Sequence, residues 1–194
     1  MANDNANSSD IVKSTILKTG TTSPNGIKGG GIFTVECRDT NGELKWVSKT
    51  PNLVVNVGLA DMNTRYFKGS GYTAAWYVGI YGAASTNNPA STDTMASHAG
   101  WTEVTAYSAS TRPVATFGAA TTADPSLIAN SASPAQFSIN TSANVGGAFL
   151  TTGDLKGGTS GTLFSAADFA APGDRVVQSG DTLSVTYTFS LDAV

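Results

Sequence analysis

The stretch that decides the fold is Ile32-Phe-Thr-Val-Glu-Cys-Arg-Asp-Thr-Asn-Gly-Glu-Leu-Lys-Trp-Val-Ser-Lys49. The dipeptide Asn41-Gly42 lies at its centre and favours a two-residue type I′ turn, because both central positions of that turn need a positive φ. Folding the chain about this turn gives an antiparallel hairpin in which Cys37 lies opposite Trp46. The stretch therefore predicts two paired strands.

This register also fixes the faces of the predicted hairpin. Val35 lies opposite Ser48, and Asp39 lies opposite Leu44. Because side chains alternate between the two faces of a strand, the apolar residues gather on one side. That side is formed by Phe33, Val35, Cys37, Leu44 and Trp46. We expect it to be buried, with the opposite, mostly charged side in solvent.

The remainder of the chain continues the pattern of strands. Residues 181–191 alternate strictly, with the apolar positions Leu183, Val185, Tyr187, Phe189 and Leu191. Shorter strands are predicted at 73–81, 102–107, 114–118, 135–140, 146–151 and 161–165. One helix is predicted at 58–68, ending at Gly69, and a single helical turn at 95–98. Closely spaced strands without intervening helices predict an all-β fold, an antiparallel β-sandwich or jelly-roll-like domain with one short helix.

Residues 1–30 differ from the rest of the chain. They are rich in Asn, Ser, Thr and Gly and hold too little apolar surface for a core of their own. We therefore divide the chain into an extended N-terminal arm, 1–30, and a β-sandwich domain, 31–194. The arm is either a disordered tail or a segment that becomes ordered against a neighbouring subunit. In the second case its partner-binding anchors are Ile11, Val12, Ile16 and Leu17.

Composition and charge exclude several classes of function. The 194 residues carry a formal net charge of −3, and the 11 Lys and Arg are scattered singly. Nucleic-acid binding normally needs a basic stripe, so no nucleic-acid partner is expected. No apolar run approaches the ~20 residues of a membrane span, and we expect no signal peptide, because the first residues lack a basic segment followed by an apolar one. Cys37 is the only cysteine and is expected to be a small buried apolar residue.

The sequence contains no pattern typical of a catalytic or metal site. His98 is the only histidine, and no Gly-x-Ser-x-Gly nucleophile turn is present. One His and one Cys cannot supply a zinc set, and there is no calcium-binding loop motif. In the stretch 156–162 a lysine precedes the glycines, the reverse of a phosphate-binding loop, so we interpret it as a hairpin connection. We expect no enzymatic activity, no catalytic residue, no cofactor and no metal.

Three aromatic residues leave one binding alternative open. Trp76, Tyr77 and Tyr81 together could stack on sugars, as exposed rings do in carbohydrate-binding modules. Strand alternation, however, places Tyr77 and Tyr81 on the side opposite Trp76. The pattern therefore favours core and interface roles over a sugar platform.

Several further stretches carry a family resemblance. They are Asn52-Leu-Val-Val-Asn-Val-Gly-Leu59, Tyr66-Phe-Lys-Gly-Ser70, Tyr72-Thr-Ala-Ala-Trp-Tyr-Val-Gly79, Asp93-Thr-Met-Ala-Ser-His-Ala-Gly-Trp-Thr-Glu103, Asn130-Ser-Ala-Ser-Pro134, Gly147-Ala-Phe-Leu150 and Gly180-Asp-Thr-Leu-Ser-Val-Thr-Tyr187. Over roughly residues 32–191 the chain resembles a group of small virion proteins of tailed bacteriophages and prophages. No catalytic residues follow from this resemblance.

The resemblance implies a non-enzymatic virion structural protein. A capsid decoration, or cement, protein is the expected role, located on the capsid exterior after synthesis in the host bacterial cytoplasm. Its partners would be the major capsid protein and copies of itself as a homo-oligomer, with no membrane involved. A tail, fibre or baseplate component is the alternative, followed by a carbohydrate-binding β-sandwich module. A fibre usually has a repetitive shaft or a trimerisation helix, and the sequence has neither.

Overall fold

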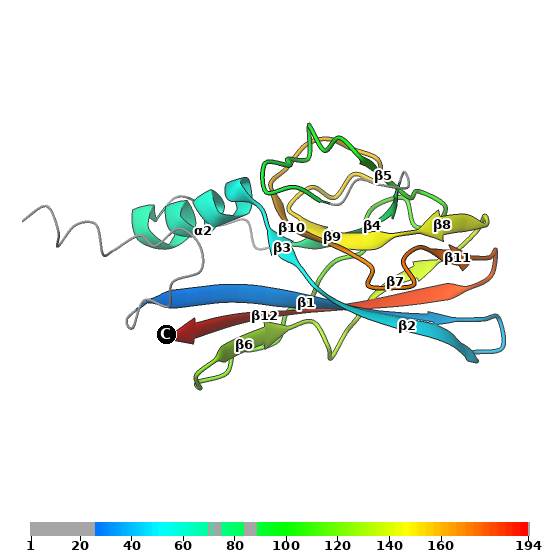
Figure 1. Ribbon diagram of the computed structural model, residues 1–194, viewed down its shortest axis with the longest axis horizontal. Helices are drawn as coiled ribbons and strands as arrows, with labels where there is room; N and C mark the ends of the chain where they lie inside the picture. Colours follow the sequence, from blue (N-terminus) through cyan, green and yellow to red (C-terminus); the bar gives the residue numbers. More distant parts are fainter. Residues whose placement is uncertain (1–25, 70, 72–74, 84–88, 194) are drawn as a thin grey trace, which may run out of the picture.

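The computed structural model describes residues 26–69, 71, 75–83 and 89–193, and within them the chain forms an antiparallel β-sandwich (Figure 1). The first sheet has the order β2-β1-β12-β6, and β7 also pairs with β12. Its strands are β1 (Ile27–Arg38), β2 (Leu44–Pro51), β6 (Ser126–Ala129), β7 (Ala135–Ser138) and β12 (Thr182–Ala193). The predicted all-β fold is confirmed.

The second sheet has the order β3-β10-β9-β4-β5. Its strands are β3 (Leu53–Val54), β4 (Tyr77–Ala83), β5 (Trp101–Glu103), β9 (Gly147–Thr151) and β10 (Leu163–Asp168). A third, two-stranded sheet pairs β8 (Ala143–Val145) with β11 (Arg175–Val177). The helix α2 (Asn56–Lys68) leaves the second sheet after β3 and lies beside the ends of β1, β12 and β6 (Figure 1).

The body of the first hairpin has the predicted register. Cys37 lies opposite Trp46, and Val35 lies opposite Ser48. Phe33, Val35 and Cys37 are buried as expected. The alternation predicted for the last strand is confirmed over residues 182–187, where positions 183, 185 and 187 are buried and the residues between them are partly exposed. Beyond Tyr187 it is lost, because Phe189 and Leu191 are partly exposed like their neighbours.

The turn of this hairpin is not the predicted type I′ turn. The Gly42 amide donates to the Asp39 carbonyl at 3.0 Å, and the Asp39 amide donates to the Glu43 carbonyl at 2.9 Å, which closes a three-residue loop. The Asp39 carboxylate accepts the amides of Asn41 at 2.8 Å and Glu43 at 2.9 Å. Gly42 has φ +83°, a left-handed conformation that favours glycine at this position. The side chain of Asp39 therefore selects the longer loop.

A β-bulge follows from this longer loop and changes one predicted contact. The register shifts between Cys37 and Arg38, so Leu44 lies opposite Arg38 rather than opposite Asp39. Leu44 is 50% exposed, and its predicted burial is wrong. The bulge takes up the extra loop residue, which leaves the pairing below it unchanged and moves only the hairpin tip.

Other predicted elements differ from the structure. The strand predicted at 102–107 is a strand only over Trp101–Glu103, the short β5. Strand β1 begins at Ile27, so residues 27–30, assigned from the sequence to the arm, pair with the end of β12. Residues 114–118 make only an isolated bridge, from Val114 to Tyr77. Residues 95–98 form no helical turn, because Thr94 and Ser97 exchange backbone hydrogen bonds and close a tight turn that carries Met95 into the core.

The main core lies between the two large sheets. It contains side chains from the first sheet, among them Phe33, Val35, Phe137, Leu183 and Val185, and others from the second, among them Val78, Ile80, Ala148 and Leu150. A second apolar cluster covers the outer face of the second sheet and contains Val55, Tyr81, Met95, Trp101, Phe149 and Leu163. The second sheet is therefore buried on both faces, which explains the continuous apolar run of β9.

Cys37 lies in the main core beside an ion pair of which only the acidic partner, Asp181, is buried. Its Sγ is 3.7 Å from Oδ2 of Asp181, and the same oxygen accepts from Nζ of Lys45 at 2.5 Å. Burial, and then the neighbouring Asp181 carboxylate, raise the pKa of the Cys37 thiol to about 12. A thiol with this pKa is almost entirely protonated at neutral pH and is a poor nucleophile.

We expect Cys37 to be unreactive in the folded protein. At pH 8 a thiol with a pKa of about 12 has roughly 10⁻⁴ of its population as thiolate. Reaction with a disulfide reagent should therefore be at least about a hundredfold slower in buffer than in concentrated urea. The test follows release of the reagent's chromophore in both solvents. Equal rates would contradict the burial of this face.

Candidate interaction surface

The helix α2 is attached mainly through its first turn, with Met62 of the second turn packing against the main core. The amide of Val55 donates to the carbonyl of Phe164 at 3.1 Å, and Gly58 is the buried residue of the helix. A Cβ at Gly58 would lie 2.4 Å from the Phe164 carbonyl oxygen, so glycine permits this close approach to β10. The rest of the helix is partly or fully exposed up to Gly69, which ends it in a left-handed conformation with φ +64°. Most of α2 thus lacks a covering layer in the described structure.

A groove of about 730 Å³ separates α2 from the end of the first sheet. Met62, Tyr66 and Phe67 of α2 form one wall. The opposite wall comes from the strand ends, with Ile27, Ile128, Phe189 and Leu191. The floor consists of Trp76, Phe117, Leu150, Phe164 and Tyr187. Its size is within the range of ligand-binding clefts, and its lining is mainly apolar.

The rim of this groove carries the most exposed large apolar side chains of the described chain. Tyr66 is 83% exposed, Ile27 78% and Phe67 77%. The rings of Tyr66 and Phe67 meet edge to face, with centroids 4.9 Å apart. Exposed aromatic residues gathered at one place are typical of an interaction surface. We call the groove and these three rim residues the apolar end.

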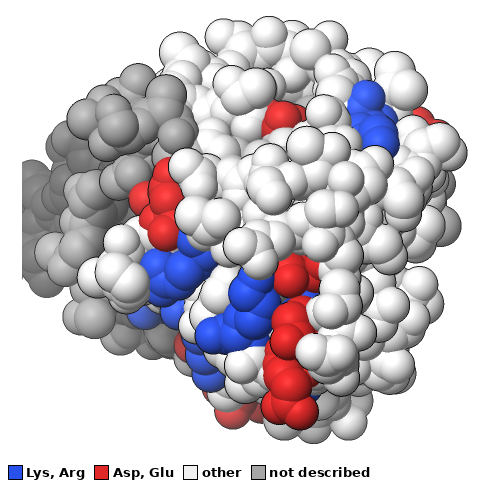
Figure 2. Space-filling model, turned by 90° about the vertical axis from the view of Figure 1, so that its right-hand side faces the viewer, with Lys and Arg blue, Asp and Glu red and all other residues white. Residues whose placement is uncertain are grey.

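The opposite end of the molecule has a different surface. Figure 2 shows acidic and basic side chains next to one another in the lower part of that view and a mostly uncharged surface above them. Arg38 and Glu36 there form an exposed ion pair at 3.5 Å. Interspersed opposite charges keep such a surface hydrated. The apolar and the charged surfaces thus lie at opposite ends of the sandwich.

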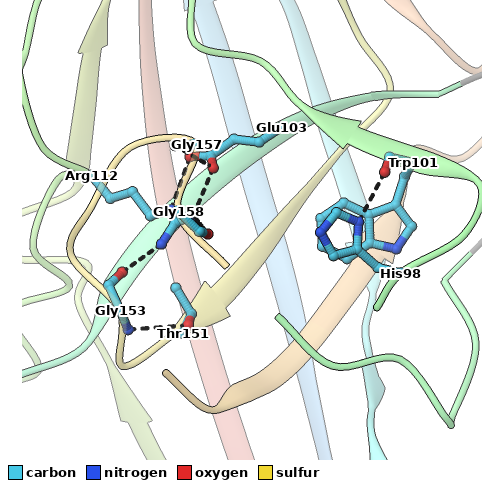
Figure 3. A network of polar contacts seen from close by, with 8 residues as sticks. All are labelled: His98, Trp101, Glu103, Arg112, Thr151, Gly153, Gly157 and Gly158. Carbon is cyan, nitrogen blue, oxygen red and sulfur yellow. Dashed lines mark hydrogen bonds and ion pairs between the residues drawn. The ribbon is translucent and has the colours of Figure 1, made fainter. Parts of the chain in front are cut away.

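A buried ion pair was not foreseen from the sequence. Arg112 is 1% exposed, and its Nε and Nη2 donate to the two carboxylate oxygens of Glu103 at 2.9 and 2.6 Å (Figure 3). Its Nη1 also donates to the Gly153 carbonyl and Nη2 to the Gly158 carbonyl, both at 2.8 Å. The Gly157 amide donates to Glu103 at 2.8 Å. The pair therefore fastens the loop between β9 and β10.

This arrangement explains the glycine-rich stretch 156–162. It lies in the connection between the antiparallel strands β9 and β10, as the sequence predicted. Lys156 donates to the Tyr107 carbonyl at 2.9 Å, and its ammonium lies 4.5 Å from the centre of the Tyr107 ring. The Lys156 ammonium is thus already bound by groups of the protein and is not directed towards a ligand. The carbonyls of this loop bind the positively charged guanidinium of Arg112, whereas a phosphate-binding loop presents amides to a negatively charged group.

His98 is half-buried at the edge of the second cluster. Its ring stacks on Trp101 with centroids 3.9 Å apart, and Nδ1 lies 2.9 Å from the Trp101 carbonyl oxygen (Figure 3). The Trp101 indole donates to Asp93 at 2.9 Å. His98 and its neighbours therefore pack the loop 89–101 onto the sheet.

The other residues considered from the sequence have separate positions. The proposed arm anchors Ile11, Val12, Ile16 and Leu17 lie outside the described residues. Tyr81 is fully buried, whereas Trp76 packs edge to face on Phe164 at the floor of the groove, so these rings do not form one platform with Tyr77. Within residues 26–69, 71, 75–83 and 89–193, no three His, Cys, Asp or Glu side chains gather as a metal site would require.

The spacing of apolar residues in the predicted helix indicated only part of the apolar end. Positions 59, 62 and 66 have helical spacing, but Leu59 is 50% exposed and only Met62 packs against the main core. The adjacent aromatic pair Tyr66-Phe67 before the helix end was the available signal, because adjacent residues on a helix cannot both face one core.

Comparison with known proteins gives no match to a family, to a curated protein or to a solved structure. In the part of the chain that the structure describes, no helix has the length and apolar character of a membrane span. The candidate surface therefore has to be interpreted from its own geometry.

We expect Arg112→Met to destabilise the protein by about 3–5 kcal/mol, because it leaves the buried Glu103 carboxylate without its charged partner. Urea unfolding followed by tryptophan fluorescence measures the loss. Adding Glu103→Gln to this variant should recover part of it, since the unpaired charge is then removed. A loss below about 1 kcal/mol for the single variant would mean that the pair contributes no more than an exposed one.

Proposed function

We propose that the protein is a non-enzymatic structural protein of a bacteriophage particle, a decoration protein that binds the outer capsid shell. The observation that carries the proposal is the apolar end, where Ile27, Tyr66 and Phe67 are each more than three-quarters exposed on a rigid sandwich. A surface of this kind attaches a protein to a partner by burying aromatic area. The family resemblance of residues 32–191 supplies the class of partner.

The conspicuous buried polar groups support a structural role. Arg112 and Glu103 are paired with each other and with loop backbone. Asn130 is fully buried, and it donates to the Val185 carbonyl and accepts from the Tyr187 amide. Catalytic groups usually stand in a cleft with perturbed protonation and room for a substrate. Here these polar groups hold strands and loops in place.

Attachment through one end suits a protein present in many copies. A repeating shell presents the same contact to every copy, so a modest single interface is sufficient when neighbouring copies also touch. The charged end, with its Arg38 and Glu36 pair, would then face solvent. The partners proposed are the major capsid protein and other copies of this chain.

Gold-labelled antibody on purified particles tests the location. The proposal expects label distributed over the shell. Label confined to the tail would favour a tail or baseplate role, and particles without label would overturn both virion assignments.

A substitution tests the attachment surface. Phe67→Asp places a carboxylate in the apolar end and should weaken binding to undecorated shells by at least about 30-fold, which corresponds to the roughly 2 kcal/mol typical of an interface aromatic. Val176→Asp is the matched control, because Val176 is 61% exposed and does not line the groove. Co-sedimentation with shells measures both. Equal binding by the two variants would place the contact elsewhere.

A further inference from the structure

We infer that, in the free protein, the groove between α2 and the first sheet is filled by residues 11–17 of the same chain, through Ile11, Val12, Ile16 and Leu17. The inference concerns the free protein and stands whether or not the protein belongs to a particle. Four large apolar side chains would cover a groove that the described residues leave open.

The first strand of the described chain begins at the groove. Ile27 is the first residue of β1 and also lines the groove, so the preceding residues start at its edge. Leu17 lies roughly ten residues before Ile27. A segment of that length spans at most about 35 Å and, when flexible, about 17 Å on average. The anchors are therefore close enough to reach the groove without help from a second molecule.

The linking residues also favour a reversal of direction. Residues 19–26 read Thr-Gly-Thr-Thr-Ser-Pro-Asn-Gly. Pro followed by Asn-Gly is typical of a turn, since Pro fixes its own φ and Asn and Gly accept a left-handed conformation. This composition would therefore allow the residues before β1 to reverse direction, as docking in the groove requires.

The groove and the segment are chemically complementary. The polar residues lining the groove belong to α2, and two of them, Asp61 and Arg65, already pair with each other at 3.1 Å. The groove therefore offers aromatic and aliphatic surface. Apart from Met1, the only large apolar residues before Ile27 are the four anchors. Tethering gives them an effective concentration in the millimolar range, which offsets part of the entropy lost on docking.

Docking has a consequence for the free protein. An uncovered aromatic patch promotes association between copies. With residues 11–17 in the groove, part of the apolar end would be covered in the free protein, which would limit such association.

Hydrogen–deuterium exchange on the full-length chain, without particles, tests the inference. Amides of residues 11–17 should exchange at least about tenfold more slowly than expected for an unstructured peptide. Phe67→Asp on one wall and Ile128→Asp on the other should abolish this protection. The matched controls are Leu59→Asp on the same helix and Leu127→Asp on the same strand, because neither residue lines the groove. Unchanged protection of β12 in every variant shows that the sandwich is folded.

Each result decides the inference. Slow exchange that is lost in both groove variants, kept in both controls and unchanged on hundredfold dilution supports it. Absence of protection in the wild-type chain overturns it. Protection that survives Phe67→Asp and Ile128→Asp places the segment elsewhere and also overturns it. Protection that disappears on dilution assigns the groove to the segment of a second copy, which contradicts docking within one chain. None of these results depends on binding to a shell.

Discussion

The pairing of β1 with β12 is the constraint on which the rest of the structure depends. The two strands are in register along their whole length, from Ile27 opposite Ala193 to Arg38 opposite Thr182, so opposite ends of the described chain form the centre of one sheet. Their inner faces supply much of the main core. Two short strands, β6 and β7, pair with the other edge of β12, and the side chain of Asn130 bonds to its backbone between them. Closing so large a loop is entropically costly, and burial of both strands must offset that cost.

The second sheet is stabilised by apolar packing on both of its faces. Its inner face packs on the β1–β12 layer, and its outer face is covered by the loop that brings Met95 and Trp101 inward. The close fit of Gly79 to the ring of Phe149, where a Cβ would lie 2.0 Å away, shows how tightly this outer layer is packed. Arg112 and Glu103 then fix the β9–β10 loop from inside. Burying an ion pair is costly, so its retention here is explained by the loop carbonyls and amide that it satisfies.

The apolar end results from how α2 is attached. Gly58 lets the first turn approach β10 closely, and Met62 packs against the core. The last turn has no such contact with the strand ends, and a groove lies between the helix and these ends. The exposed fractions of Tyr66, Ile27 and Phe67 are the highest among the large apolar side chains of the described residues, so this end offers the most apolar surface to a partner. The same geometry makes the groove accessible to the residues that precede Ile27. One structural feature thus supports both the proposed attachment and the proposed docking of the N-terminal segment.

The sequence by itself determined the all-β class, the register of the first hairpin around Cys37 and Trp46, the alternation of the last strand and the helix ending at Gly69. These features depend on periodicity and turn chemistry within a few residues, which a single sequence displays directly. The three-residue loop that exposes Leu44 also comes from a local contact, the Asp39 carboxylate bonding the amides of Asn41 and Glu43, which the Asn-Gly pattern alone did not reveal. Only the tertiary structure decided the Arg112–Glu103 pair and the groove beside α2, because the first depends on a loop from another strand pair and the second on a helix attached near one end to a distant strand. The spacing of residues along the chain does not predict such long-range contacts.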